Sequence, residues 1–195
     1  MNRQSNYDVS ERFIKRWSPR SFDSEYTLKE EDVQKLFEAA RWSPSSFNNQ
    51  PWTFLYALKG DKYFDLYLSL LNDFNKEWAS QASLLGFIIA DLTDPKGNTN
   101  KHASFDCGAA WMALTMQARD LDLYTHGMGG IHYEKCYEEL EVPNDQYRVI
   151  CAFTVGKKAS PEELSEDLQD EEEMNSRHPT DQIFRNGKFK ARERK

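Results

Sequence analysis

Residues 105–118 restrict the fold of this chain more than any other stretch, because they are apolar on nearly every side. A helix with this composition has no polar face to leave in water, so it must be covered all round. A chain of 195 residues is close to the largest size that one hydrophobic core usually organises. We therefore expect a single domain, with a second subunit covering part of this helix.

The charge and composition exclude several classes of protein. The chain carries 25 basic and 32 acidic residues, a net charge of −7, which argues against a broad nucleic-acid surface. No window approaches the roughly 18 apolar residues of a membrane span, and the first residues lack the apolar core of a secretory signal. We expect a cytoplasmic protein without a membrane or nucleic-acid partner. The 3 cysteines are widely spaced and include no CxxC pair, which indicates reduced thiols.

Helical and strand patterns alternate along the chain. Thr27 and Glu30 have capping-box spacing ahead of apolar residues at helical intervals, so a helix should begin here. The predicted helices cover 28–41, 63–78, 105–118 and a short segment that ends at Leu140, and the predicted strands cover 52–58, 84–90 and 147–155. Residues 125–131 are rich in glycine and are expected to form a loop.

The composition changes from residue 157 onward. Residues 162–173 hold eight acidic residues in twelve, and the last eleven residues hold six basic ones. A segment this polar cannot build a core of its own, so it must lie on something else if it is ordered. We expect the acidic run to be solvated.

Three polar segments have residue types suited to ligand binding. Arg16, Ser18 and Arg20 place two guanidinium groups and a hydroxyl within five residues, and guanidinium groups donate paired hydrogen bonds to phosphate. The loop 44–51 sets Ser, Asn and Gln side chains between two prolines, which suits the polar edge of a planar heterocycle. The glycines of 127–130 would let backbone amides approach a ligand.

Each segment also has a simpler interpretation. The arginines alone are compatible with a solvated basic face, the proline-rich loop with an ordinary turn, and the glycines with a loop that binds nothing. His102 and Asp106 stand four residues apart at the start of an expected helix, where polarity is common, and two ligands are too few for a metal site. We therefore expect no metal.

In this order, the segments resemble the FMN-dependent nitroreductase family, from about residue 12 to residue 189. The motifs that carry the resemblance are Arg16-x-Ser-x-Arg20 followed by Phe22, Ser43-Pro-Ser-Ser-x-Asn-x-Gln-Pro-Trp52, Asn75 with Ala82, Met128-Gly-Gly-Ile131 and Arg177-His-Pro179. The sequence departs from some members at Gly129, where they have an acidic residue, and at Trp78, where they have lysine. Substrate preference is therefore not carried over.

The resemblance implies an α+β, nitroreductase-like fold. Its central sheet would be mixed but mostly antiparallel, flanked by helices, in an interlocked homodimer with two flavins at the interface. Residues 1–195 would form one nitroreductase-like domain, in which 157–195 is a C-terminal extension that wraps the partner subunit and delivers Arg177.

The resemblance also implies FMN as the cofactor and NADH or NADPH as the electron donor. The residues implied to bind FMN are Arg16, Ser18, Arg20, Pro44, Ser45, Ser46, Asn48, Asn75, Met128, Gly129, Gly130 and Arg177. Arg16, Arg177 and Ser18 would hold the phosphate, Arg20 and Asn75 the pyrimidine end, and 44–48 would come from the partner subunit. Gly129 and Gly130 would offer backbone amides near the flavin N5 and O4.

The activity implied is reduction of small electron-poor acceptors, such as nitroaromatics or quinones. Ping-pong hydride transfer through flavin N5 needs no side-chain acid or base, so no catalytic residue is expected. One alternative is a specialised member of the family: a dehalogenase, a flavin-cleaving enzyme, or an enal or semialdehyde reductase. The other is a flavin-binding protein without turnover.

Overall fold

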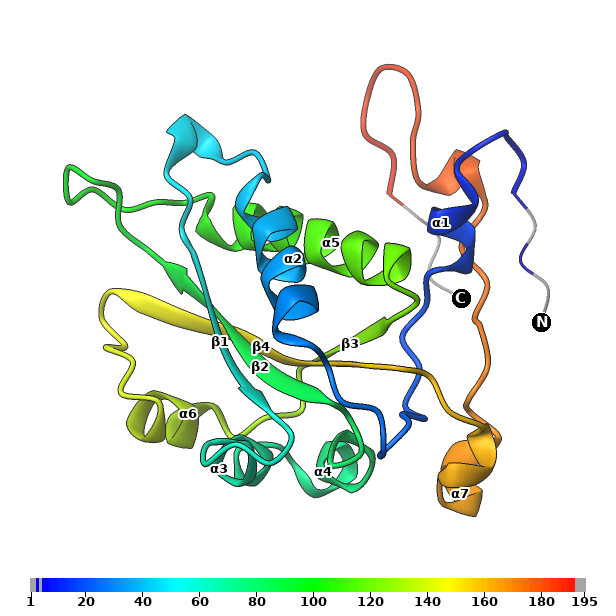
Figure 1. The fold of residues 1–195 in the computed structure, drawn as a ribbon. Helices are drawn as coiled ribbons and strands as arrows, with labels where there is room; N and C mark the ends of the chain where they lie inside the picture. The colour runs from blue at the N-terminus through cyan, green and yellow to red at the C-terminus, as the bar shows by residue number, and fades with distance from the viewer. Residues whose placement is uncertain (1–2, 4, 192–195) are drawn as a thin grey trace.

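The computed structural model describes residues 3 and 5–191, and a sheet of antiparallel strands lies at its centre (Figure 1). The strands are β1 (Trp52–Leu58), β2 (Leu84–Asp91), β3 (Tyr124–Met128) and β4 (Tyr147–Gly156), in the order β1-β2-β4-β3. The predicted strands at 52–58, 84–90 and 147–155 are confirmed. The predicted loop over 125–131 is wrong in its first part, because Thr125 pairs with Val155 and Met128 with Ala152.

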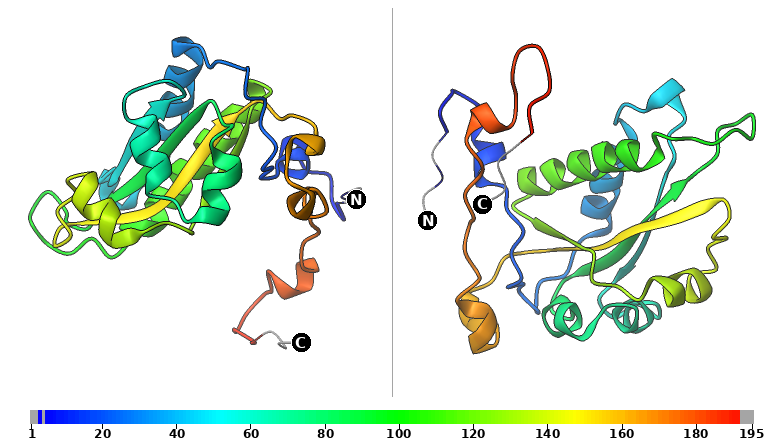
Figure 2. Two further views of the ribbon diagram at one scale, coloured as in Figure 1. Left: turned by 90° about the horizontal axis from the view of Figure 1, so that it is seen from below. Right: turned by 180° about the vertical axis from the view of Figure 1, so that it is seen from behind.

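Helices cover both faces of the sheet, so the prediction of an α+β fold with flanking helices is confirmed (Figures 1 and 2). α2 and α5 pack on one face, and α3, α4 and α6 pack on the other, each with its own apolar cluster. The helices are α1 (Glu11–Lys15), α2 (Glu30–Arg41), α3 (Phe64–Ser69), α4 (Asp73–Ala79), α5 (Ala103–Asp120), α6 (Tyr133–Glu139) and α7 (Glu166–Gln169). The prediction of a capping box at Thr27 and Glu30 is wrong. α2 begins at Glu30, and Lys29 takes the N-cap position without a side-chain hydrogen bond.

The single helix expected over 63–78 is two helices, α3 and α4, separated by a break. Leu71 forms an isolated β-bridge with Ile131, and the Asn72 N–H donates to the Gly130 carbonyl over 3.0 Å. Backbone groups that a continuous helix would use are therefore bonded to a distant loop. Asn72 restarts the helix, because its Oδ1 accepts from the Asn75 N–H over 3.0 Å.

α5 is buried on one face and exposed on the other. Ala110, Leu114 and Ala118 are fully buried, whereas Phe105 is 80% exposed and Met112 is 38% exposed. The expectation that one subunit cannot cover the whole helix is consistent with this distribution. An apolar helix face is left in water unless another surface covers it.

The acidic segment after β4 packs on its own subunit. Leu164 and Leu168 are buried in the cluster beneath α3 and α4, and Glu172 is only 8% exposed. The prediction that the acidic run is solvated is therefore wrong at Glu172, whose carboxylate accepts from three donor groups. Beyond this point the chain turns back along the N-terminal segment, and we call residues 174–191 the C-terminal arm (Figures 1 and 2).

Cys107, Cys136 and Cys151 form no disulfide with one another. Burial raises the pKa of Cys107 to about 12 and that of Cys136 and Cys151 to about 11. Among the described residues, no helix is both long and apolar enough to cross a membrane.

Candidate functional site

Arg16, Ser18 and Arg20 lie on one side of an extended segment that follows α1. The backbone of Arg16 is extended (φ −67°, ψ 126°), and residues of an extended chain alternate in direction. Trp17 and Pro19 are buried, whereas the three predicted site residues between and beside them are partly exposed. Arg16 Nη1 donates to Ser18 Oγ over 3.3 Å. The structure therefore brings Arg16 and Ser18 together, with Arg20 further along the same side of the segment.

Arg16 lies close to two other arginines, Arg177 on the C-terminal arm and Arg3 near the N-terminus. Burial lowers the pKa of Arg16 most, and the positive charges of Arg177 and then Arg3 lower it further. None of the three forms an ion pair with a carboxylate among the described residues. Guanidinium groups gathered without a carboxylate partner can donate charge-assisted hydrogen bonds to a phosphate dianion.

Arg3 was not predicted, and it is hydrogen-bonded to both segments that carry the other arginines. It donates to the carbonyls of Ile14, Arg16 and Asn175 over 3.0, 2.6 and 2.8 Å. A single arginine near a chain end has no sequence signal that distinguishes it from a solvated one. A cavity of about 550 Å³ adjoins the cluster, lined by Arg3 and Arg177 and by apolar residues that include Phe13.

Arg20 lies at the other end of the segment, against α4. Its guanidinium carbon is 5.4 Å from the centre of the Phe74 ring, and its Nη2 is 3.4 Å from the Glu171 carboxylate. The buried Glu172 carboxylate fixes the backbone here, because it accepts from the N–H groups of Arg20 and Ser21 over 2.8–3.0 Å. The acidic run thus positions a predicted site residue, a role that its composition conceals.

Asn75 meets Gly130 as the prediction requires. Asn75 is 8% exposed, and its Nδ2 donates to the Gly130 carbonyl over 3.1 Å. A Cβ at Gly130 would lie 2.6 Å from the side-chain nitrogens of both Asn72 and Asn75, so only glycine fits. Nδ2 keeps a second hydrogen, and Oδ1 has no hydrogen bond among the described residues. These two atoms are suited to the polar edge of a ligand.

Met128 and Gly129 differ in their exposure to solvent. Met128 is 2% exposed and its side chain lies in the core. Gly129 is exposed, and a Cβ there would contact nothing within 4 Å. An acidic side chain in this position would therefore fit without steric conflict.

His126 lies against the 16–20 segment and packs on Trp78, and the sequence does not predict it as a site residue. His126 Nδ1 is 2.9 Å from the Pro19 carbonyl, and its ring centre is 4.5 Å from that of the buried Trp78. Burial lowers the pKa of His126 most, and Arg20 and Arg16 lower it further, against the Pro19 hydrogen bond and Glu172. Charges from the whole segment therefore converge on this ring.

The remaining predicted residues lie far from this group. Pro44, Ser45, Ser46 and Asn48 belong to the loop before β1, which contains the 3-10 turn Ser46–Asn48, at the end of the molecule opposite the N-terminal segment (Figure 1). The turn is anchored to α5, because the Ser46 N–H donates to the buried Asp106 carboxylate over 3.1 Å. No group of three potential metal ligands occurs among the described residues. One subunit thus holds two separate parts of the predicted site.

The loop has an unusual backbone. Phe47, Asn48 and Gln50 have φ values of 51°, 57° and 49°, in the left-handed region that non-glycine residues rarely adopt. The Phe47 side chain is 97% exposed. A strained loop that presents an aromatic ring to water is typical of a segment built to contact something else.

The fold and the site define a class: an α+β protein with helices on both faces of an antiparallel sheet and, beside it, an arginine cluster that has no carboxylate partner among the described residues. The sequence matches the Nitroreductase family over residues 14–85 and 65–157. The chain belongs to the nitroreductase family.

Two curated relatives have different names. An oxygen-insensitive NADPH nitroreductase of Helicobacter acinonychis (strain Sheeba) is 31% identical over 129 residues, which is 63% of this chain and 60% of the relative. A CLA biosynthesis enone reductase of Lactiplantibacillus plantarum is 22% identical over 190 residues, covering 79% of this chain and 87% of the relative. The chain thus spans about three fifths of the length of the nitroreductase relative.

Solved structures share the fold over nearly the whole chain. A structure described as an oxidoreductase containing FMN has a TM-score of 0.93 and 36% identity, covering 98% of both chains. A nitroreductase from a Desulfovibrio desulfuricans subspecies, in complex with FMN, has a TM-score of 0.74 and 21% identity, covering 95% of this chain and all of that one. These likenesses confirm the expected nitroreductase-like fold.

Proposed function

We propose that this protein is an FMN-dependent NAD(P)H oxidoreductase that reduces small electron-poor acceptors such as nitroaromatics or quinones. The observation that carries the proposal is the pair Arg16 and Arg177, which lie close enough for the Arg177 charge to lower the pKa of Arg16 and which have no carboxylate partner among the described residues. The names of the relatives support it, since they include an NADPH nitroreductase and an oxidoreductase containing FMN.

The residues of the site fit FMN in charge and shape. Arg16, Ser18 and Arg177 supply donors for the phosphate, while Arg20 and Asn75 supply a cation and an amide for the pyrimidine end. Gly130 forms a cradle that a Cβ would fill, and the backbone of 128–130 offers amides beside it. When bound, FMN supplies a ring that accepts hydride from NAD(P)H and passes it to the acceptor. The protein binds and orients, and no side chain need transfer a proton.

A homodimer completes this site. In the proposal, Pro44, Ser45, Ser46 and Asn48 reach the flavin of the partner subunit, because the loop before β1 lies on the other side of the molecule from α1 and the segment that follows it (Figure 1). Residues 1–195 form a single domain, and the C-terminal part of 157–195 wraps the partner. The exposed apolar side chains Phe105 on α5 and Phe184 on the arm are consistent with coverage by a second copy.

The visible spectrum of the purified protein tests the proposal. We expect flavin absorbance that bleaches under anaerobic conditions when NADH or NADPH is added and returns when an acceptor is added. Protein that takes up no FMN would disprove the proposal. Yellow protein that NAD(P)H leaves oxidised in rapid mixing would instead indicate a flavin-binding protein without turnover.

Replacing Arg16 tests the phosphate assignment directly. Arg16→Ala should weaken FMN binding by about 1–3 kcal/mol, because it removes a charge-assisted hydrogen bond to the phosphate. Flavin fluorescence titration measures this, with Arg41→Ala as a control, since Arg41 is exposed and paired with Glu38. Equal FMN affinity in the Arg16 variant and the wild type would show that the phosphate lies elsewhere.

The family relatives raise a second candidate among acceptors. The enone reductase relative matches most of this chain, so activated C=C bonds belong in the substrate panel beside nitro and quinone compounds. If a single enone dominates in kcat/KM by more than about tenfold, the protein is a specialised reductase rather than a broad one.

A further inference from the structure

Arg3 joins two distant parts of the chain through backbone carbonyls alone. Its Nη1 donates to Ile14 and Arg16 over 3.0 and 2.6 Å, and its Nε donates to Asn175 over 2.8 Å. Asn175 lies two residues before Arg177 on the C-terminal arm. One guanidinium therefore holds the segment of Arg16 and the segment of Arg177 together.

This contact brings three like charges close to one another. Burial and the Arg177 charge lower the pKa of Arg3, as Arg177 and Arg3 lower that of Arg16. Other arginines of the chain are paired with carboxylates: Arg12 with Asp120, and Arg119 with Asp122. The Arg3 cluster has no such partner among the described residues. Its repulsion is offset when a dianion binds, so the arrangement favours an occupied site.

Arg3 also has donors left over. Its bonds to the three carbonyls leave both hydrogens of Nη2, which is buried and has no partner among the described residues. Arg3 and Arg177 also line a cavity of about 550 Å³. Arg3 therefore brings its charge and an unpaired buried donor to the two segments that carry the other arginines.

We propose that Arg3 is a positioning residue of the phosphate site, which clamps the Arg16 and Arg177 segments together and adds a third positive charge. The inference rests on the proposed function, because the phosphate is that of FMN. Removal of Arg3 would let the C-terminal arm move away from Arg16. Affinity for the phosphate group should then fall, while affinity for the isoalloxazine ring should not.

FMN and riboflavin separate these effects, because riboflavin has the same ring system and no phosphate. We would titrate wild type, Arg3→Met, Arg3→Lys and the control Arg12→Met with both flavins and follow fluorescence quenching. Arg3→Met should lower FMN affinity about tenfold to a hundredfold and change riboflavin affinity less than about threefold. Arg12→Met removes a nearby exposed arginine that is paired with Asp120, and should match wild type with both flavins.

The variant Arg3→Lys separates the effect of the positive charge from that of the hydrogen bonds that hold the two segments together. Lysine keeps the charge but its single nitrogen cannot reach carbonyls on two segments, so its FMN affinity should lie between those of wild type and Arg3→Met. If Arg3→Met does not melt cooperatively, Arg3→Lys carries the test. Wild-type FMN affinity in the variant that folds, or an equal loss for FMN and riboflavin, would overturn the inference. Wild type that binds neither flavin would disprove the proposed function itself, and wild type that binds FMN no more tightly than riboflavin would overturn the phosphate site.

Discussion

The buried ring of His126 should make the free energy of unfolding depend on pH. Pro19 has only a carbonyl to offer, so His126 Nδ1 carries the hydrogen in this contact, and burial lowers the pKa of the ring below its ordinary 6.5. The folded chain holds the neutral ring, whereas the unfolded chain takes up a proton near pH 6.5. The stabilisation is therefore full above that pH and is lost as the pH falls through the lower pKa of the folded state.

Replacing His126 should remove this contribution. We expect the free energy of unfolding of the wild type to fall more steeply than that of His126→Gln when the pH is lowered from 7 to 5. Urea unfolding at several pH values measures the two slopes. His132→Gln is the matched control, because His132 is exposed at the start of α6 and should leave the wild-type slope unchanged. Parallel slopes for wild type and His126→Gln would show that burial of this ring is not linked to stability.

Some of the site residues are visible in the sequence and others are not, for a physical reason. Arg16, Ser18 and Arg20 alternate with buried residues, so an extended segment presents them together, and spacing along the chain is enough to show it. Arg3 and Glu172 act through contacts across more than a hundred residues. Composition assigned Glu172 to a solvated run, since a buried carboxylate and an exposed one look alike in sequence.

The break between α3 and α4 is the element that positions Asn75. Asn72 supplies the cap of α4 through its Oδ1, and its own N–H is bonded to Gly130, which also binds the Asn75 side chain. Asn72→Ala should cost about 0.5–2 kcal/mol of unfolding free energy, because the Asn75 N–H loses its acceptor. We also expect weaker FMN binding, since the first turn of α4 carries Asn75.

Urea unfolding and FMN titration of the same preparation measure both effects. Ser10→Ala is the control, because Ser10 occupies the N-cap of α1 without a side-chain hydrogen bond to that helix. It should change stability by less than about 0.5 kcal/mol. Asn72→Ala with unchanged stability would mean that the break is held by the Leu71 and Gly130 backbone contacts alone.

Elements with strong periodicity were predicted well, and those set by long-range pairing were not. β1 has the expected bounds, and β2 and β4 each extend one residue further. The agreement is close because short runs of aromatic and β-branched residues strongly favour strands. β3 was missed because Gly127 weakens its pattern and its strand character comes from pairing with β4. The helix expected over 63–78 failed for a similar reason, since its apolar face is continuous although its backbone is bonded to 130–131.

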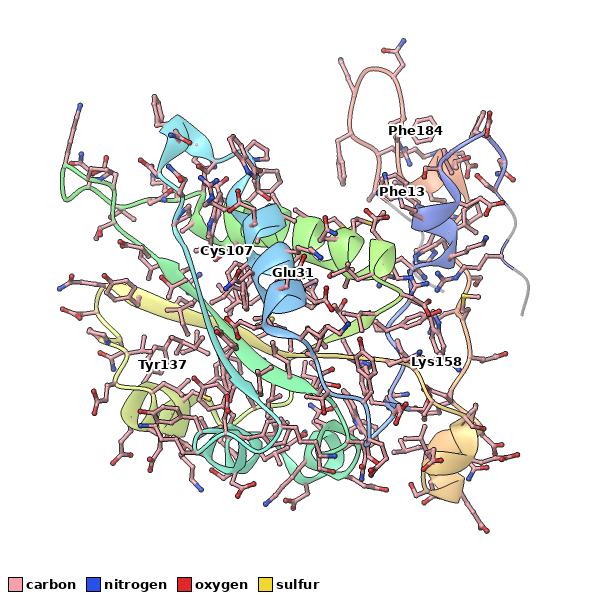
Figure 3. The ribbon with its side chains drawn as sticks, viewed as in Figure 1. Phe13, Glu31, Cys107, Tyr137, Lys158 and Phe184 are labelled. Carbon is pink, nitrogen blue, oxygen red and sulfur yellow. The ribbon has the colours of Figure 1, made fainter. Side chains whose placement is uncertain are left out.

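At the scale of the whole molecule, apolar groups remain exposed where the sequence predicted a partner. Phe105 on α5, Trp42 before the strained loop, Phe47 within that loop and Phe184 on the arm are 61% to 97% exposed. Figure 3 shows Phe13 and Phe184 near each other, away from the sheet, on segments from opposite ends of the chain. In the proposed homodimer, a second copy covers these groups and its loop reaches the arginine cluster. Sequence periodicity indicates that a surface is apolar, but it does not identify the surface that covers it.

If each flavin site is built from both subunits, two defective variants should restore each other in a mixed dimer. A site built within one subunit would show no such recovery. Arg16→Ala removes a proposed phosphate contact, and Asn48→Gly removes a loop side chain without strain, because glycine tolerates the φ of 57° at this position. Each variant alone should bind FMN poorly, since every site in its homodimer is defective. A mixed dimer has one site with both defects and one with neither. Random pairing of equal amounts should therefore restore about a quarter of all sites.

Refolding the two variants together and measuring tightly bound FMN per subunit checks this prediction. Each variant refolded alone gives the baseline, and wild type refolded in the same way gives the full value. Recovery near a quarter of the wild-type value requires that Arg16 and Asn48 serve the same flavin from different subunits, because neither variant chain contains an intact set. Recovery no greater than the average of the two baselines would instead place both residues in sites that one subunit completes, and the separation of the loop from the arginine cluster would need another explanation.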